Sequence, residues 1–189
     1  AQTRKLFKVC VMRGIPIFTF INKMDRESRN SFDLLEEIEN ELGIKTYPVN
    51  WPIGSGKSFK GVYNRDKRAI ISFTANGGHQ EVEATEVDLN DEKLSDIIGE
   101  ENYRTIVDDI ELLDGASEEF DIDAVQNGKL SPVFFGSALT NFGVGPFLEN
   151  FLQMTPSPLA RESDQGVIDP FEEDFSAFVF KIQANMNKA

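Results

Sequence analysis

The sequence predicts an α/β fold in which part of a doubly wound sheet is interrupted by an α+β insertion. The first indication is residues 5–42, where a helical pattern, an apolar strand pattern and a second helical pattern follow one another. The same order resumes with a strand that begins at residue 132 and a helical pattern over 144–154. Several short strand patterns separate these two parts. We therefore expect two different kinds of sheet in one chain.

The doubly wound part is assigned to residues 1–43 and 131–159. Helices are expected over 5–12 and 31–42, and the apolar run 15–21 reads as a buried strand between them. Gly43 predicts the end of the second helix. The sequence predicts buried stripes at Phe32, Leu35, Ile38 and Leu42 of the helix over 31–42, and at Phe147, Leu148, Phe151 and Leu152 of the helix over 144–154.

The insertion is assigned to residues 44–130. Strands are expected at 46–49, 60–63, 69–74 and 81–87, with a hairpin connection at 64–67. A helical pattern follows, with Tyr103, Ile106, Val107, Ile110 and Leu113 on one face. Residues 81–123 hold 17 acidic and 2 basic residues, a net charge of -15. RNA phosphates would repel such a module, which is either a docking surface for a basic protein or an ordinary solvated face.

The C-terminal part is expected to leave this sheet. Pro156 and Pro158 end the helical pattern, and 160–174 reads as a polar linker. Residues 175–184 alternate like the first strand of a β-barrel, so 175–189 are assigned to the start of a second domain.

Composition indicates an ordinary soluble protein. With 40% hydrophobic residues and 16 phenylalanines the chain can bury a sizeable core. No apolar stretch reaches the roughly 20 residues that a membrane-spanning helix needs. The single Cys10 excludes an internal disulfide, fits a reducing cytoplasm and reads as a packed core thiol. The single His79 reads as a loop residue and makes no zinc site.

The most informative motif is Asn22-Lys23-Met24-Asp25, directly after the strand pattern that ends at Ile21. Open α/β sheets bind ligands beyond the carboxyl ends of their strands. The two oxygens of the Asp25 carboxylate match the adjacent N1–H and N2–H₂ donors of guanine. The Asn22 amide can bridge the purine and a neighbouring loop, and the Lys23 stem can lie over the base. The same letters also occur in ordinary loops and helix caps.

A second signal follows the apolar run 132–135. There Gly136 leads into Ser137-Ala138-Leu139, and such small residues let a backbone N–H approach a ring oxygen. Together the two motifs resemble the guanine-recognition motifs of translational GTPases, in which the alanine amide contacts guanine O6. The resemblance implies a P-loop GTPase sheet, GTP or GDP as ligand, and Asn22, Lys23, Asp25, Ser137, Ala138 and Leu139 as guanine-binding residues.

Local signatures refine the resemblance. Residues 51–54, 59–63 and 178–186 look like the peptide chain release factor 3 family more than elongation factor G, which stays open as an alternative. The release factor family implies a cytoplasmic, ribosome-dependent GTPase that recycles the codon-reading release factors at the end of translation. In elongation factor G and its relatives an insertion between the two motifs lies near the ribosomal stalk proteins.

The phosphate-binding half of such a site is missing from the sequence. The stretch 54–58 ends in G-K-S, but a phosphate loop needs glycine where Trp51 stands, so it reads as a turn. Residues 96–99 match D-x-x-G only by chance, because they follow Asp25 in the chain. We therefore expect an internal fragment without catalytic residues or Mg²⁺ ligands, inactive alone, weak in GDP binding and prone to self-associate through an exposed sheet edge.

Two other functions remain open from the residues alone. A non-enzymatic interaction module would use the acidic insertion as its surface, and it predicts no guanine preference. An adenine-specific P-loop kinase fragment would set Asp25 against the N1 acceptor of adenine and would leave Ser137 and Ala138 unexplained.

Overall fold

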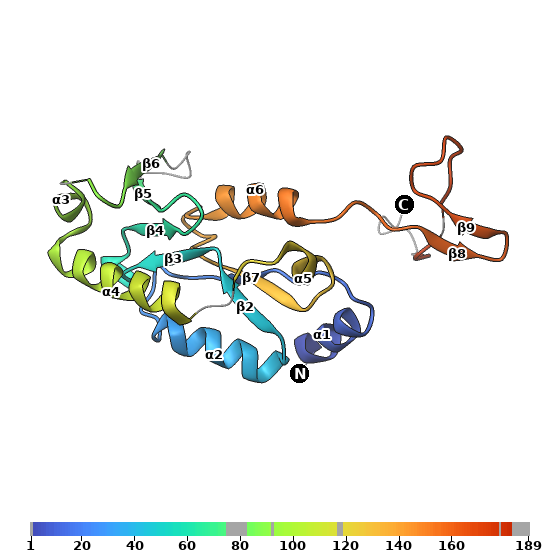
Figure 1. The fold of residues 1–189 in the computed structure, drawn as a ribbon, viewed down its shortest axis with the longest axis horizontal. Coiled ribbons are helices and arrows are strands. Elements are labelled where there is room, and N and C mark those ends of the chain that lie inside the picture. The colour runs from blue at the N-terminus through green and yellow to red at the C-terminus, as the bar shows by residue number, and fades with distance from the viewer. Residues whose placement is uncertain (1, 75–82, 92, 117–118, 178, 183–189) are drawn as a thin grey trace, which may run out of the picture. The chain divides into compact units, whose positions relative to one another are not determined.

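The computed structural model describes residues 2–74, 83–91, 93–116, 119–177 and 179–182 (Figure 1). The chain divides into two compact units, residues 1–155 and residues 156–189. The helices are α1 (Gln2–Met12), α2 (Ser31–Leu42), the 3₁₀ helix η1 (Gly56–Ser58), α3 (Leu94–Ile98), α4 (Glu100–Ala116), α5 (Ile122–Gln126) and α6 (Val144–Met154). The strands are β1 (Thr19–Ile21), β2 (Lys45–Pro48), β3 (Asn50–Ile53), β4 (Gly61–Asn64), β5 (Ala69–Thr74), β6 (Glu83–Asp88), β7 (Leu130–Phe135), β8 (Arg161–Ser163) and β9 (Gly166–Ile168).

The first sheet of the first unit is parallel and has the order β1-β7-β2. The central strand β7 is buried along its whole length, as expected for a parallel strand covered on both faces. The strand before Asn22 and the strand before Gly136 are therefore neighbours, as the sequence predicted. Self-association through an outer strand of this sheet stays a prediction.

Helices cover both faces of this sheet. Phe134 of β7 packs against Phe147 of α6 with ring centroids 5.1 Å apart, and Phe20 of β1 meets the same ring at 5.3 Å. The alternate residues Val133 and Phe135 belong to a second cluster that includes side chains of α2. Figure 1 shows α2 and α6 on opposite sides of the parallel sheet. The mixed α/β fold with a parallel sheet is confirmed.

The ends of α2 show how the sequence sets its length. The side chain of Asn30 accepts a hydrogen bond from the Phe32 N–H, which satisfies a free donor of the first turn. At the other end Gly43 adopts φ +70° and its N–H donates to the Glu39 carbonyl at 2.8 Å. Glycine takes this left-handed conformation without the steric cost of a side chain.

The second sheet is an antiparallel meander of order β3-β4-β5-β6. Its β4–β5 hairpin turns at residues 65–68, close to the predicted connection. Helix α4 packs through Ile106, Ile110 and Leu113, which join the core cluster that also holds Val133 and Phe135. The two sheets of the first unit therefore share one hydrophobic core.

Several strand expectations need correction. Residues 46–49, which were assigned to the insertion, lie mostly in β2, and β2 pairs with β7 in the parallel sheet. The predicted strand 15–21 is paired only over Thr19–Ile21, and it includes Pro16, which has no N–H for a ladder. Strand β3 was not predicted. It contains Pro52, and it is the outer strand of its sheet, where proline is tolerated.

Three predicted core residues are exposed. On α6, Leu148 and Leu152 are 51% and 77% exposed, because Phe147, Phe151 and Met154 make the contacts with the sheet and its neighbours. Val107 is 40% exposed, beside the buried stripe of α4. Cys10 is only partly buried on α1, so the expectation of a packed core thiol was wrong.

The second unit differs from its predicted linker. Within residues 160–174, β8 and β9 form an antiparallel hairpin in which Gly166 adopts φ +118° and the Ser163 hydroxyl donates to the Gly166 carbonyl at 2.8 Å. No strand forms in 175–177 or 179–182. An alternating segment becomes a strand only when another strand pairs with its backbone, and no described residue does so. His79 and residues 81–82 lie outside the described residues.

Candidate functional site

Two loops meet where β1 and β7 end. The Gly136 N–H donates to the carbonyl of Ile21 at 3.0 Å, and the Met24 N–H donates to the carbonyl of Gly136 at 3.1 Å. These two backbone hydrogen bonds join the two segments just beyond the carboxyl ends of β1 and β7. The loop of residues 22–25 and the loop of residues 136–139 are thereby held side by side, as the sequence predicted for the carboxyl edge of a parallel sheet.

Side chains join the same two loops. The buried Ser137 hydroxyl donates to Asp25 Oδ1 at 2.6 Å. The Ala138 N–H donates to Asn22 Oδ1 at 2.9 Å, and the Lys23 N–H donates to the same oxygen at 2.8 Å. Five of the predicted site residues therefore take part in hydrogen bonds that tie the two loops together at adjacent positions, Ser137 and Ala138. Leu139 follows on the second loop with an exposed side chain.

Several polar groups of the site stay available. Asp25 Oδ2 and Asn22 Nδ2 make no hydrogen bond within the described part of the chain. Asn22 and Lys23 are exposed, whereas Asp25 is partly buried. The arrangement presents one carboxylate oxygen, two amide hydrogens and a lysine stem at one edge of the sheet, which is a donor and acceptor set that can recognise a planar polar ring.

Unusual backbone conformations shape the loops. Lys23 adopts φ +71°, a left-handed conformation that is uncommon outside glycine and clusters at functional sites. At Gly136 a Cβ atom would lie 2.4 Å from the Phe142 carbonyl oxygen and 2.8 Å from Phe20 Cζ. Two backbone hydrogen bonds of 2.9 Å between Ser137 and Phe142 close the second loop into a tight turn. Only glycine fits at position 136.

Sequence reasoning missed residues that hold the loops from within. Met24 is only 1% exposed and packs in the core cluster that the two sheets of the first unit share, so the variable position of the first motif anchors its loop. Asn50 exchanges two hydrogen bonds with the backbone of Phe135. The available signal was a single amide inside the largely apolar run 46–53.

The turn at residues 54–58 does not form a phosphate cradle. The N–H of Gly56 donates to the Met24 carbonyl at 2.9 Å, and the N–H of Ser58 donates to the Ser55 carbonyl at 3.1 Å. The N–H groups of Ser55 and Phe59 also bond within this turn. A phosphate loop needs such donors free to face the ligand, so these contacts support the interpretation of G-K-S as a turn.

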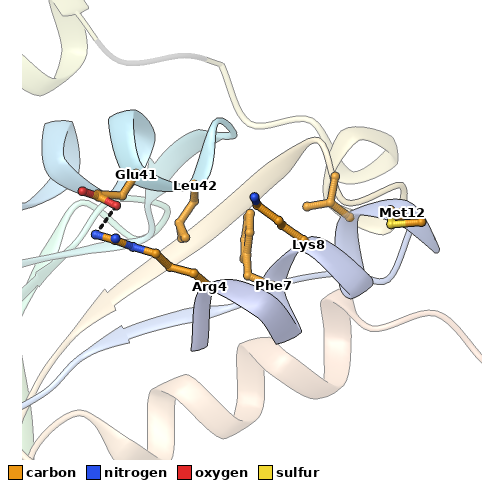
Figure 2. Close-up of a pocket in the computed structure, with 7 residues that line it drawn as sticks. Arg4, Phe7, Lys8, Met12, Glu41 and Leu42 are labelled. Carbon is orange, nitrogen blue, oxygen red and sulfur yellow. Dashed lines mark ion pairs between the residues drawn. The ribbon is translucent and has the colours of Figure 1, made fainter. Parts of the chain in front are cut away.

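A separate pocket lies between α1 and α2. Its volume is about 420 Å³, and Arg4 and Glu41 form an ion pair of 2.5 Å across it (Figure 2). Phe7, Lys8, Met12 and Leu42 lie around the same space (Figure 2). Helix α2 ends here and leads into the amino end of β2, so this pocket lies at the opposite end of the sheet from the two loops.

Among the described residues, no group of three His, Cys, Asp or Glu side chains could hold a metal ion. No helix in the described ranges is long and apolar enough to cross a membrane.

Comparisons with known proteins agree with the family resemblance. Residues 1–157 match the family model described as "Elongation factor Tu GTP binding domain". A protein of Symbiobacterium thermophilum named "Peptide chain release factor 3" is 54% identical over 100% of this chain and 36% of its own length. The protein of the same name from Gloeobacter violaceus is 54% identical over 99% of this chain and 35% of its own. The chain thus spans about a third of these relatives.

A crystal structure of a Thermus thermophilus protein matches with a TM-score of 0.55 and 24% identity, over 82% of this chain and 24% of that chain. At that identity the likeness supports the fold alone. The match of the family model over residues 1–157 includes both loops and the two sheets of the first unit. The chain therefore belongs to the family of elongation factor Tu GTP binding domains.

Proposed function

We propose that this chain supplies the guanine-recognition half of the nucleotide site of a ribosome-dependent GTPase that acts in translation termination. The hydrogen-bonded pair of loops carries the proposal, because Ser137 and Ala138 fix the two side chains, Asp25 and Asn22, that would read the base. Relatives named "Peptide chain release factor 3" support a place in termination. We extend the proposal to a cytoplasmic protein that binds GTP and GDP, hydrolyses GTP and recycles codon-reading release factors.

Base recognition follows from the free groups of the loops. The Asp25 carboxylate would accept from guanine N1–H and N2–H₂, while the Ser137 hydroxyl keeps it from rotating. The Asn22 amide hydrogens face no described partner and would donate to the purine, with Oδ1 still tied to the second loop. Guanine O6 would draw on the Ala138 N–H, which it would share with Asn22 Oδ1, and Leu139 would border the ring.

The base contacts alone give weak binding. Each hydrogen bond contributes about 0.5–1.5 kcal/mol net, or up to about 3 kcal/mol with a charged partner, and association entropy offsets much of this. We therefore expect the 189-residue chain to bind GDP with a Kd on the order of 1 mM or weaker. Phosphate and Mg²⁺ binding belong, in this proposal, to residues other than these 189.

Basic residues of the β4–β5 hairpin form ion pairs with acidic residues of the insertion. Lys67 pairs with Glu86 at 2.8 Å, and Arg68 pairs with Asp114 at 3.2 Å. Helix α4 carries exposed acidic residues, and we place contact with a basic partner there. Contact with ribosomal stalk proteins, as in the family, is a further part of the proposal.

The deciding experiment compares GDP with ADP by isothermal titration calorimetry. It uses this chain and the protein as it is naturally produced. We expect the natural protein to bind GDP tightly and to ignore ADP, and the 189-residue chain to bind neither well. If the natural protein shows no guanine preference, the proposal is wrong and a non-enzymatic role of the acidic insertion takes its place. A natural protein that prefers guanine nucleotides but does not support translocation would be a termination factor. One that prefers guanine nucleotides and supports translocation would be an elongation factor G-like protein.

A further inference from the structure

Asn50, the first residue of β3, contacts the end of β7 directly before the second base-binding loop. The side-chain amide of Asn50 donates to the carbonyl oxygen of Phe135 at 3.2 Å, and the Phe135 N–H donates to Asn50 Oδ1 at 2.7 Å. Asn50 is only 3% exposed. One side chain thus takes the place of a neighbouring strand for the last residue of β7, two positions before Ser137.

The following turn contacts the first loop. The Gly56 N–H is shared between the carbonyl oxygens of Met24, at 2.9 Å, and Arg26, at 3.1 Å. Gly56 adopts φ +57°, and a Cβ atom there would lie 2.5 Å from Glu27 Oε1 and 3.2 Å from the Glu27 nitrogen. A side chain at position 56 would therefore displace the exposed Glu27 carboxylate and press on the backbone nitrogen of Glu27 in the first loop.

Packing reinforces both contacts. Trp51 meets the Phe135 ring with centroids 5.2 Å apart, and Phe59 meets the Phe142 ring at 6.0 Å. Met24 belongs to the same buried cluster as Trp51 and Phe59. The loops accordingly rest on the core of the insertion as well as on their own sheet, and a tightly packed core transmits displacement.

We propose that residues 50–58, here called the bracing segment, position the two base-binding loops and thereby set the selectivity of the site for guanine. Asn50 is the positioning residue for the loop of residues 136–139, and Gly56 is the positioning residue for the loop of residues 22–25. The inference rests on the proposed guanine site and deepens it, since it makes base selectivity a property of the insertion.

The physical link runs through the end of β7. When Phe135 shifts, Ser137 and Ala138 shift with it, and their hydrogen bonds to Asp25 and Asn22 lengthen together. Hydrogen bonds weaken steeply with distance and angle. The contact most sensitive to the angle of Asp25 is the one to the guanine 2-amino group, because it needs both carboxylate oxygens in the plane of the base.

The test measures selectivity in the protein as it is naturally produced. Kd values for GDP and inosine diphosphate, which lacks the 2-amino group, give a selectivity ratio. Asn50→Leu removes both bonds to Phe135 at similar side-chain size. If the variant loses the free energy of one hydrogen bond between Asp25 and the guanine 2-amino group, this ratio should fall by about two- to tenfold. A purely structural role would lower the unfolding midpoint and leave the ratio of the folded protein unchanged.

The matched control for Asn50 is Asn64→Leu. Asn64 is paired with Asn50 in the register of β3 and β4 and is 7% exposed, but its Oδ1 accepts from the Lys67 N–H in the hairpin. We expect Asn64→Leu to destabilise the insertion and to keep the wild-type selectivity ratio. An equal fall in the ratio for both variants would overturn the assignment of Asn50.

A second pair of variants keeps the test decisive if Asn50→Leu does not fold. Gly56→Ala adds a Cβ against Glu27, whereas Gly43→Ala adds one at a similar positive φ with nothing within 4 Å. We expect the selectivity ratio to fall for Gly56→Ala and not for Gly43→Ala. A wild-type protein without preference for GDP overturns the proposed function. If the wild-type protein prefers GDP and both Asn50→Leu and Gly56→Ala keep the wild-type selectivity ratio, the bracing role is wrong and the proposed function stands.

Discussion

Two stretches of this chain carry a lysine among small polar residues after a strand, and they use their polar groups in opposite ways. The loop of residues 22–25 leaves Asn22 and Lys23 exposed and one oxygen of Asp25 without a partner in the described part of the chain. The turn of residues 54–58 directs its Gly56 N–H into that loop and bonds its Ser55 and Ser58 N–H groups within itself. One stretch can meet a ligand and the other holds the first in place.

The difference lies in which hydrogen-bonding groups are already satisfied. Backbone N–H groups bind phosphate only where the fold leaves them free and convergent. In the turn, Gly56 matches the glycine of the G-K-S sequence in a phosphate loop, but its N–H donates to the carbonyl oxygens of Met24 and Arg26. A motif therefore identifies a site only together with the partners that its groups already have.

The largest expected effect tests the first stretch. Asp25→Asn replaces two acceptors by one acceptor and one donor, which mismatches guanine and suits xanthine, whose 2-position carries oxygen. Loss of a charged hydrogen bond of about 1.5–3 kcal/mol predicts roughly 10- to 150-fold weaker GTP binding and a shift of preference to XTP. Competition titrations with both nucleotides on the natural protein measure this. Unchanged GTP affinity would show that Asp25 does not read the base.

Local patterns were enough for part of the fold. The bounds of α2 and α6 follow from helical periodicity together with Gly43 and Pro156, and the structure confirms them. The meeting of the two loops followed from the rule that parallel strands present their carboxyl ends at one edge. The helix bounds depend on residues that are neighbours in the chain, and the meeting of the two loops depends on a general rule for parallel sheets.

Other features depend on partners that sequence patterns do not name. Leu148 is exposed because aromatic residues of the same helix reach the sheet first. Strand β3 forms despite Pro52 because it is an outer strand, and the hairpin in the second unit depends on a turn at Gly166. The bracing contact of Asn50 joins residues 85 positions apart, and a lone buried amide does not reveal its partner.

A smaller effect tests a carboxylate that the insertion uses internally. Asp109 accepts a hydrogen bond from Trp51 Nε1 at 2.8 Å. Burial raises the pKa of the Asp109 carboxyl above its usual range, the bond from Trp51 lowers this pKa in part, and the charge of Asp108 raises it further. Because the folded-state pKa exceeds the unfolded one, the folded state gains stability below the unfolded pKa and loses it as pH rises through the folded pKa.

We therefore expect Asp109→Asn to be at least as stable as the wild type at pH 7, since the amide still accepts from Trp51 and carries no charge to desolvate. This advantage should shrink as pH falls into the range where the Asp109 carboxyl is protonated. Urea unfolding at pH 7 and near pH 4 measures it. The control is Glu111→Gln, an exposed residue of α4 whose charge does not contribute to the raised pKa of Asp109. A destabilised Asp109→Asn at pH 7 would mean that the charge itself supports the contact with Trp51.

The smallest expected effect sharpens the comparison between the two lysines. Lys57 is exposed in the turn, whereas Lys23 stands in the base-binding loop at φ +71°. In a phosphate loop, the lysine contacts the β- and γ-phosphates, and its removal would weaken nucleotide binding severely. Because the N–H groups of Ser55, Gly56 and Ser58 already donate inside the protein, we expect Lys57→Ala to leave the GDP Kd of the natural protein within about twofold of wild type.

Lys23→Ala is the matched variant, because it removes the methylene stem that would cover the base. It should weaken GDP binding by more than Lys57→Ala and leave the preference for GDP over ADP in place, since Asp25 still reads the base edge. Isothermal titration of both variants against GDP and ADP gives the four constants needed. If Lys57→Ala proved the more damaging of the two, the turn would have to reach the phosphates, and the hydrogen bonds of Gly56 to the first loop would have to break when nucleotide binds.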